Sequence, residues 1–141
     1  MIRFFNIILI SLISITSSAQ KDIMTKAKNY ISEDYTELLF ISIENQKLYH
    51  IKNDKIFTVF IISSSKYGIG NKKDSKKTPL GLHKIKQKYG KNVPIYGIMK
   101  ERIFHGDIAN IYSDKNKSKT DDITSRIMWL EGVEKAINKG K

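Results

Sequence analysis

The chain has 141 residues, a formal net charge of +11 and no cysteine, so it can form neither a disulfide nor a metal–thiolate site. Its length supports one domain with a single hydrophobic core. Most of the positive charge is lysine rather than arginine, which favours an anionic cell envelope over nucleic acid as a partner. A lysine-rich surface that is simply well solvated explains the same charge.

Residues 1–19 have the pattern of a secretory signal peptide. Arg3 gives a short basic start, an apolar stretch runs from Phe4 to Ile15, and positions 17–19 are small residues. We expect cleavage before Gln20 and export to the periplasm or cell envelope. The apolar stretch is shorter than the ~20 residues that a bilayer-spanning helix needs, so no stable membrane span is expected after cleavage.

Residues 20–36 form the predicted N-terminal helical segment. From Lys21 to Asp34, apolar residues recur at spacings of three and four with lysines between them. These apolar residues are Ile23, Met24, Ala27, Tyr30 and Ile31. So short a stripe of medium-sized side chains is typical of a helix face that packs on a core rather than on a membrane.

Three antiparallel strands are predicted from Glu37 to Ser63. Runs of β-branched and aromatic residues are separated by the polar pairs Asn45-Gln46 and Asn53-Asp54, which is typical of hairpins. Apolar side chains of the first run alternate between two faces: Leu39, Ile41 and Ile43 on one, Leu38 and Phe40 on the other. A sheet with two partly apolar faces needs cover on both sides, as in a sandwich or beside a packed helix.

The rest of the chain is predicted to be loops and short strands. A long loop is expected from Ser64 to Lys77, which has glycines, clustered lysines and almost no apolar residues. Its Gly68-Ile69-Gly70 lacks the third glycine and following helix of a dinucleotide-binding motif. The later expectations are strands at Leu82–Tyr89 (with one basic face), Ile95–Met99 and Arg102–Ile108, a surface loop at Asn110–Asp122, and a last apolar segment at Ile123–Leu130.

No recognised catalytic or metal-binding pattern surrounds the histidines at positions 50, 83 and 105. The sequence contains no Gly-x-Ser-x-Gly, Ser-x-x-Lys or His-Glu-x-x-His. His50 and His83 fall in predicted strands and are interpreted as ordinary sheet residues. The residues by themselves therefore predict no catalytic residue and no metal site.

Four segments, in this order, carry a family resemblance: Gln46–Tyr49, Ser63–Asn71, Lys77–Ile85, and Thr124–Glu134 with Asn138–Gly140. Together they resemble the L,D-transpeptidase catalytic domain, also called the YkuD domain, over about Glu37–Gly140. The resemblance implies an α+β, mainly β, sandwich-like domain over residues 37–141, incomplete at its C-terminal end and preceded by a short helix.

In that family, a cysteine thiolate attacks a carbonyl in a peptidoglycan stem peptide and passes the acyl group to a second stem, without a cofactor. The family's His-Gly pair and Ser-x-Gly-Cys segment lie beyond the part that corresponds to Asn138–Gly140, and neither follows here. His105-Gly106 lies before Trp129 and is not expected to replace the catalytic histidine.

The expected function is that of a truncated L,D-transpeptidase-family protein of peptidoglycan cross-linking, inactive alone because the cysteine nucleophile is missing. The alternative is a noncatalytic basic module that binds the anionic envelope. Stem peptides and the envelope are the expected partners, and nucleic acid is not. The substrate-groove candidates are Tyr67, Gly68, Gly70, Thr78 and Pro79, although these residues can equally serve only to close a turn.

Overall fold

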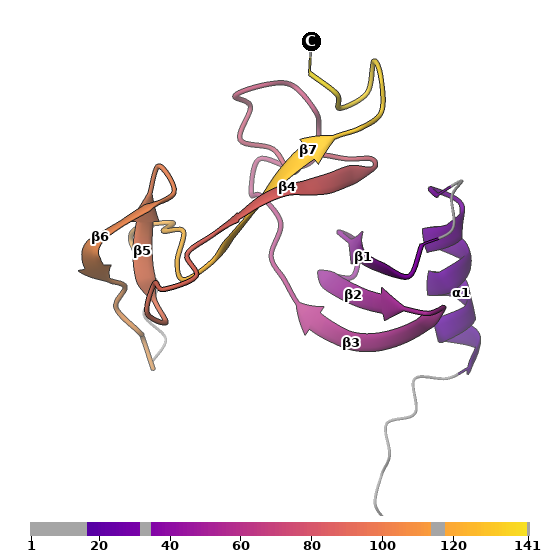
Figure 1. Cartoon of the computed structure of the whole chain (residues 1–141), viewed down its shortest axis with the longest axis horizontal. Coiled ribbons are helices and arrows are strands. Elements are labelled where there is room, and N and C mark those ends of the chain that lie inside the picture. Colours follow the sequence, from indigo (N-terminus) through magenta and orange to yellow (C-terminus); the bar gives the residue numbers. More distant parts are fainter. Residues whose placement is uncertain (1–16, 32–34, 114–117, 141) are drawn as a thin grey trace, which may run out of the picture. The chain divides into compact units, whose positions relative to one another are not determined.

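The computed structural model describes residues 17–31, 35–113 and 118–140. Within these ranges, strands make up most of the regular structure and one short helix lies near the N-terminus (Figure 1). The elements are α1 (Ser17–Lys28), β1 (Glu37–Ser42), β2 (Lys47–Lys52), β3 (Lys55–Ile61), β4 (His83–Tyr89), β5 (Gly97–Lys100), β6 (Ile103–Ile108) and β7 (Ile127–Gly132). The predicted mainly β class is confirmed, and several small sheets are consistent with a sandwich-like fold.

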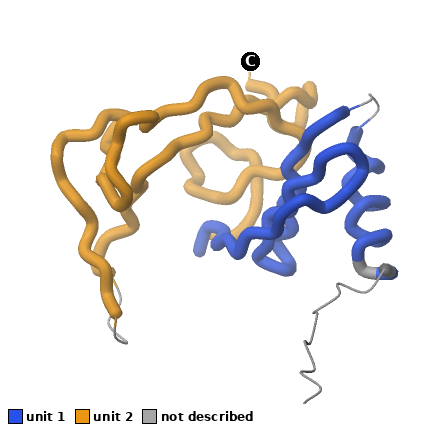
Figure 2. The backbone as a smooth tube through the Cα atoms, turned by 60° about the horizontal axis from the view of Figure 1, so that its bottom comes forward, with its two compact units in different colours: residues 1–66 blue, residues 67–141 orange. Residues whose placement is uncertain are grey.

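The chain divides into two compact units, Met1–Lys66 (unit 1) and Tyr67–Lys141 (unit 2), coloured separately in Figure 2. Unit 1 contains α1 and β1 to β3, and unit 2 contains β4 to β7. Residues 1–16 of the predicted signal peptide lie outside the described residues, and the expected cleavage position before Gln20 falls inside α1. The predicted boundaries at 19/20 and 36/37 stay predictions.

The strands of unit 1 form the predicted antiparallel meander, in the order β1-β2-β3. At the second turn, Asn53 and Asp54 have φ angles of 48° and 58°. Two consecutive residues with positive φ make the tight turn whose twist matches that of paired strands, and Asn and Asp tolerate this conformation well. Both predicted hairpins are confirmed, since Gln46 also ends a turn between β1 and β2.

The core of unit 1 lies between α1 and one face of the sheet. Ile23 and Ala27 of the helix pack with Tyr49 and Ile51 of β2, and Ile51 is fully buried. Leu38, Phe40, Met24, Tyr35, Ile56 and Val59 surround this cluster. The sequence predicts cover on both faces. Only the Leu38 and Phe40 face has it in the described part of unit 1, because Leu39 and Ile41 on the opposite face are 38% and 45% exposed.

The predicted helix is wrong at both ends. The apolar spacing predicts Lys21–Asp34, whereas α1 covers Ser17–Lys28 and residues 29–31 are not helical. Residues 32–34 of the predicted helix lie outside the described residues. After Lys28 the backbone tightens, and the amide of Tyr30 donates to the carbonyl of Ala27 at 3.2 Å, a spacing of three residues. Asn29 lies at this point and is a weak helix former. Tyr30 therefore leaves the apolar stripe and is 62% exposed.

Unit 2 contains two antiparallel strand pairs, β4 with β7 and β5 with β6. The predicted strands at Leu82–Tyr89, Ile95–Met99 and Arg102–Ile108 are confirmed to within two residues at each end. Within the predicted apolar segment Ile123–Leu130, strand β7 begins only at Ile127, because Ser125 has a φ of 64°, which interrupts an extended strand.

Two side-chain arrangements join the strands of unit 2. Lys84 and Lys86 both form ion pairs with Glu131, at 2.9 and 2.8 Å, and a bulge between Ile85 and Gln87 lies beside them. Hydrogen bonds from these two lysines lower the pKa of Glu131 from 4.5 to about 2. In the second arrangement, Arg102 of the turn before β6 places its guanidinium over the Trp129 ring of β7, 4.3 Å from the ring centroid.

Candidate functional site

The candidate substrate residues lie on a loop that closes on itself at the start of unit 2. The Gly70 amide donates to the Thr78 carbonyl at 3.0 Å, and the Thr78 amide donates to the Gly68 carbonyl at 2.9 Å. Ile69 and Thr78 thereby form an isolated parallel bridge. Gly68 and Gly70 have φ angles of 82° and 149°, which side-chain-bearing residues rarely adopt. We call residues 68–81 loop 68–81.

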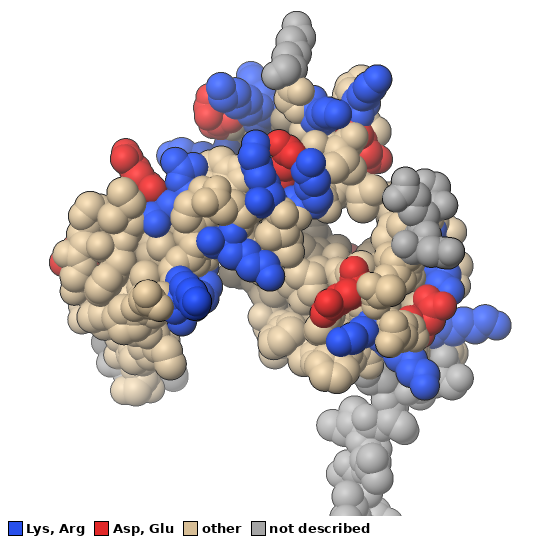
Figure 3. Space-filling model, viewed as in Figure 1, with Lys and Arg blue, Asp and Glu red and all other residues tan. Residues whose placement is uncertain are grey.

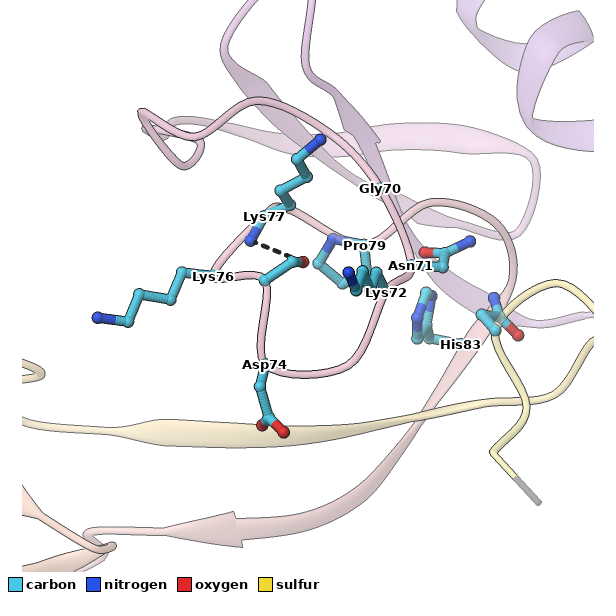
Figure 4. A pocket seen from close by; sticks show the side chains of 10 residues that line it. Gly70, Asn71, Lys72, Asp74, Lys76, Lys77, Pro79 and His83 are labelled. Carbon is cyan, nitrogen blue, oxygen red and sulfur yellow. Dashed lines mark hydrogen bonds between the residues drawn. The ribbon is translucent and has the colours of Figure 1, made fainter.

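Loop 68–81 encloses an open pocket of about 190 Å³, shown in Figure 4. Of the five predicted groove residues, Gly70 and Pro79 line it, whereas Tyr67, Gly68 and Thr78 do not. Gly68 and Thr78 contribute through the backbone bonds that shape the loop, and Tyr67 is 52% exposed. The remaining lining residues are Asn71, Lys72, Asp74, Ser75, Lys76, Lys77, His83 and Asn138.

The lysines of this pocket are lining residues that were not among the five groove candidates. Lys72, Lys76 and Lys77 line it, and Asp74 is the one acidic residue of the lining. In Figure 4 the carboxylate of Asp74 and the ammonium groups of Lys76 and Lys77 extend away from Pro79, whereas Lys72 lies beside it. The signal was present in the sequence as a lysine cluster, but composition alone does not tell which lysines face inward.

A clasp from the C-terminal segment holds the end of loop 68–81. The carboxylate of Glu134 accepts a short hydrogen bond from the Leu82 amide, and the Asn138 side-chain amide donates to the carbonyls of Leu80 and Leu82 at 3.0 Å each. Asn138 Oδ1 accepts from the Glu134 amide at 3.0 Å. From the loop itself, Asn71 Oδ1 accepts from the Leu80 amide at 2.8 Å. We call Glu134 and Asn138 together the Glu134–Asn138 clasp.

Gly81 is the position where the clasp and the loop come closest. A Cβ atom at Gly81 would overlap the Glu134 carboxylate and lie 2.8 Å from Asn138 Nδ2. The residue also has a φ of 92°. The glycine of Thr78-Pro79-Leu80-Gly81 is therefore required both for space and for backbone conformation.

The three histidines have different surroundings. His83 begins β4 and lines the pocket, so its interpretation as an ordinary sheet residue is incomplete. Its Nδ1 lies 2.9 Å from the Gly81 carbonyl, which can only accept, so Nδ1 carries the proton. His50 Nε2 lies 2.6 Å from Glu37 Oε1 in unit 1, within hydrogen-bonding distance, and His105 is exposed on β6. The residues that the structure describes contain no cluster of three or more metal-ligating side chains.

Residues 36–139 match the family model of the L,D-transpeptidase catalytic domain, YkuD. The chain belongs to this family. The match agrees with the resemblance over about Glu37–Gly140 and includes loop 68–81 and both residues of the clasp. No curated protein and no solved structure matches the chain.

The L,D-transpeptidase family acts on peptidoglycan stem peptides and is associated with the cell envelope. Membership gives this chain a family role in peptidoglycan cross-linking. No helix in the described ranges is long and apolar enough to cross a bilayer.

Proposed function

We propose that this chain is an exported L,D-transpeptidase-family protein that engages peptidoglycan stem peptides and does not catalyse acyl transfer by itself. The family match over residues 36–139 carries the proposal. The 141 residues contain no cysteine, so they do not supply the thiolate that the family uses. A serine hydroxyl needs an activating base to replace a thiolate. Among the described residues, the His50 ring is hydrogen-bonded to Glu37 and the His83 ring to the Gly81 carbonyl.

In this proposal, the substrate contacts come from the groove residues of loop 68–81. Gly68 lets a peptide backbone approach closely, because it has no side chain and nothing lies within 4 Å of where a Cβ would be. Pro79 and Tyr67 offer rigid apolar surface beside this glycine. The Glu134–Asn138 clasp keeps this loop in one conformation, which reduces the entropy lost on binding.

Export rests on the signal-peptide pattern of residues 1–19. The expected mature protein begins at Gln20 and is found in the periplasm or cell envelope. Intact-mass measurement of the protein from cell fractions tests this expectation. A full-length mass that still begins with Met1, in the cytoplasmic fraction, would contradict it.

The proposal is tested by incubating the purified chain with muropeptides and a labelled D-amino acid. We expect no label transfer, together with saturable retention of the chain on purified sacculi. Label transfer above the rate without protein would show that the chain is a competent catalyst. Absence of retention would show that it does not engage peptidoglycan.

A second candidate is a noncatalytic module that binds the anionic envelope through charge alone. The net charge of +11 favours it. On the face shown in Figure 3, however, Lys and Arg occur in several groups with Asp and Glu among them. A purely electrostatic module should lose retention equally when any exposed lysine is neutralised, and retention should fall steeply with salt. If retention on sacculi depends on the groove residues, the first candidate is favoured over the second.

A further inference from the structure

We propose that the pocket of loop 68–81 binds a single anionic oxygen group, a carboxylate or a phosphate, beside Lys72 and Lys77. The assignment of this group to a stem-peptide carboxylate rests on the proposed function, whereas anion binding itself does not.

The charge of the pocket is the first argument. Lys72, Lys76 and Lys77 are opposed in the lining by Asp74 alone, whose carboxylate extends away from Lys72 in Figure 4. Neither Lys72 nor Lys77 forms an ion pair with a carboxylate in the part of the chain that the structure describes. These cations are therefore not neutralised by a carboxylate of the described residues, and an anion bound in the pocket would be attracted by both.

The fixed dipoles around the pocket are the second argument. Asn71 Oδ1 is occupied by the Leu80 amide, so the orientation of its side chain is set and its Nδ2 donor remains for a ligand. The side-chain amide of Asn138 instead already donates to the carbonyls of Leu80 and Leu82, so Asn138 lines the pocket without offering this donor to a ligand. The pocket thus combines ammonium groups with an oriented amide donor.

The size of the pocket limits the ligand. A volume of about 190 Å³, open to solvent, accommodates one charged group and its immediate substituent rather than a whole disaccharide peptide. The aliphatic stem of Lys77 passes close to Gly70, because a Cβ at Gly70 would lie 3.2 Å from Lys77 Cδ. Gly70 therefore lets the Lys77 side chain cross the pocket edge.

The test uses the full chain, labelled with ¹⁵N and titrated with sodium phosphate or with N-acetyl-D-alanine at constant ionic strength. We expect saturable shifts confined to the amides of residues 68–83 and the Asn71 side chain. Lys72→Gln and Lys77→Gln should each raise the Kd about three- to tenfold, the range expected for one lost charge-assisted contact at an exposed site. Lys73→Gln is the matched control, since this neighbouring lysine does not line the pocket, and it should change the Kd less than about twofold.

The outcomes separate the possible sources and the two proposals. Competition between the two probes for the same shifts supports one anion site, and a response to only one probe supports the site and identifies its ligand as a carboxylate or a phosphate. Non-saturable shifts, or an equal effect of Lys73→Gln, would overturn the pocket. If the unmodified chain shows no anion binding but is retained on sacculi, this inference is overturned and the proposed function stands. If the unmodified chain binds the anions but is not retained on sacculi, the proposed function is overturned and this inference stands.

Discussion

The side-chain amide of Gln46 bonds Ser64 at both of its ends: Oε1 accepts from the Ser64 amide and Nε2 donates to Ser64 Oγ, each at 2.9 Å. Its Nε2 also donates to the Ile43 carbonyl at 2.6 Å, and its backbone carbonyl accepts from the Ile62 amide. One residue therefore joins the turn after β1 to the segment that follows β3. In the segment Gln46–Tyr49, the glutamine has a structural task.

Replacement of Gln46 by Ala should lower the free energy of unfolding by about 1–3 kcal/mol, because it leaves the partly buried amide of Ser64 without its acceptor. Urea denaturation followed by circular dichroism measures the change. Asn45→Ala in the same turn is the control, and it should cost less than about 0.5 kcal/mol because the Asn45 side chain is exposed. Equal effects of the two substitutions would show that the turn, and not the amide pair, is responsible.

Gly81→Ala should destabilise the protein more than Gly106→Ala. Both glycines have positive φ, 92° and 102°, so each substitution introduces backbone strain of about 1–2 kcal/mol. Only at Gly81 does the new methyl group also overlap the Glu134 carboxylate, whereas nothing lies within 4 Å at Gly106. We expect at least about 1 kcal/mol between the two variants in urea denaturation. Equal destabilisation of the two variants would mean that the Glu134 carboxylate moves aside without lowering the free energy of unfolding.

Asn138→Asp should open the clasp with almost no change in side-chain size. The new carboxylate would face the carbonyls of Leu80 and Leu82 and the Glu134 carboxylate in place of an amide donor. Hydrogen exchange at the Leu82 amide, which donates to Glu134, should become at least about tenfold faster. Asn92→Asp, an exposed position with the same charge change, serves as the control. Unchanged exchange at Leu82 would show that Glu134 holds the loop alone.

Glu131 should make the stability of the protein depend on acidic pH. Its pKa is lowered in the folded state from 4.5 to about 2, so its contribution is fully present above about pH 4.5 and is lost as the pH falls through about 2. The difference in urea midpoint between the wild type and Glu131→Gln should therefore shrink steadily from pH 5 to pH 2. High salt should shrink it at every pH, because the pairs with Lys84 and Lys86 are exposed. A midpoint difference that is constant over this range would show that Glu131 is not paired in solution.

Local patterns predicted unit 1 well. Alternation of apolar residues and two polar pairs were enough for β1 to β3, because each hairpin forms between neighbouring segments. The helix boundary was missed because apolar spacing continues past Asn29, while the helix is ended by the local backbone preference there. The spacing of apolar residues predicts which face of the helix packs on the core. It does not predict the residue at which the helix ends.

Long-range partners could not be predicted from the sequence. The pairing of β4 with β7 joins His83 to Gly132, and the clasp joins Leu82 to Glu134, with about fifty residues between the partners. No local propensity contains that information. For the same reason, the motif Thr78-Pro79-Leu80-Gly81 indicated a groove, but not that Asn138 would form part of its wall. The lysines facing the pocket became identifiable only after Gly70 and Thr78 had closed the loop.

Trp129 is the only tryptophan of the chain and belongs to unit 2, 42% exposed and stacked with Arg102. Within the described residues, the only helix is α1, and it belongs to unit 1. Tryptophan emission consequently senses one unit, and the helical ellipticity band senses the other. Each half of this protein therefore has its own native optical probe, and their melting can be compared in one sample without attaching a dye.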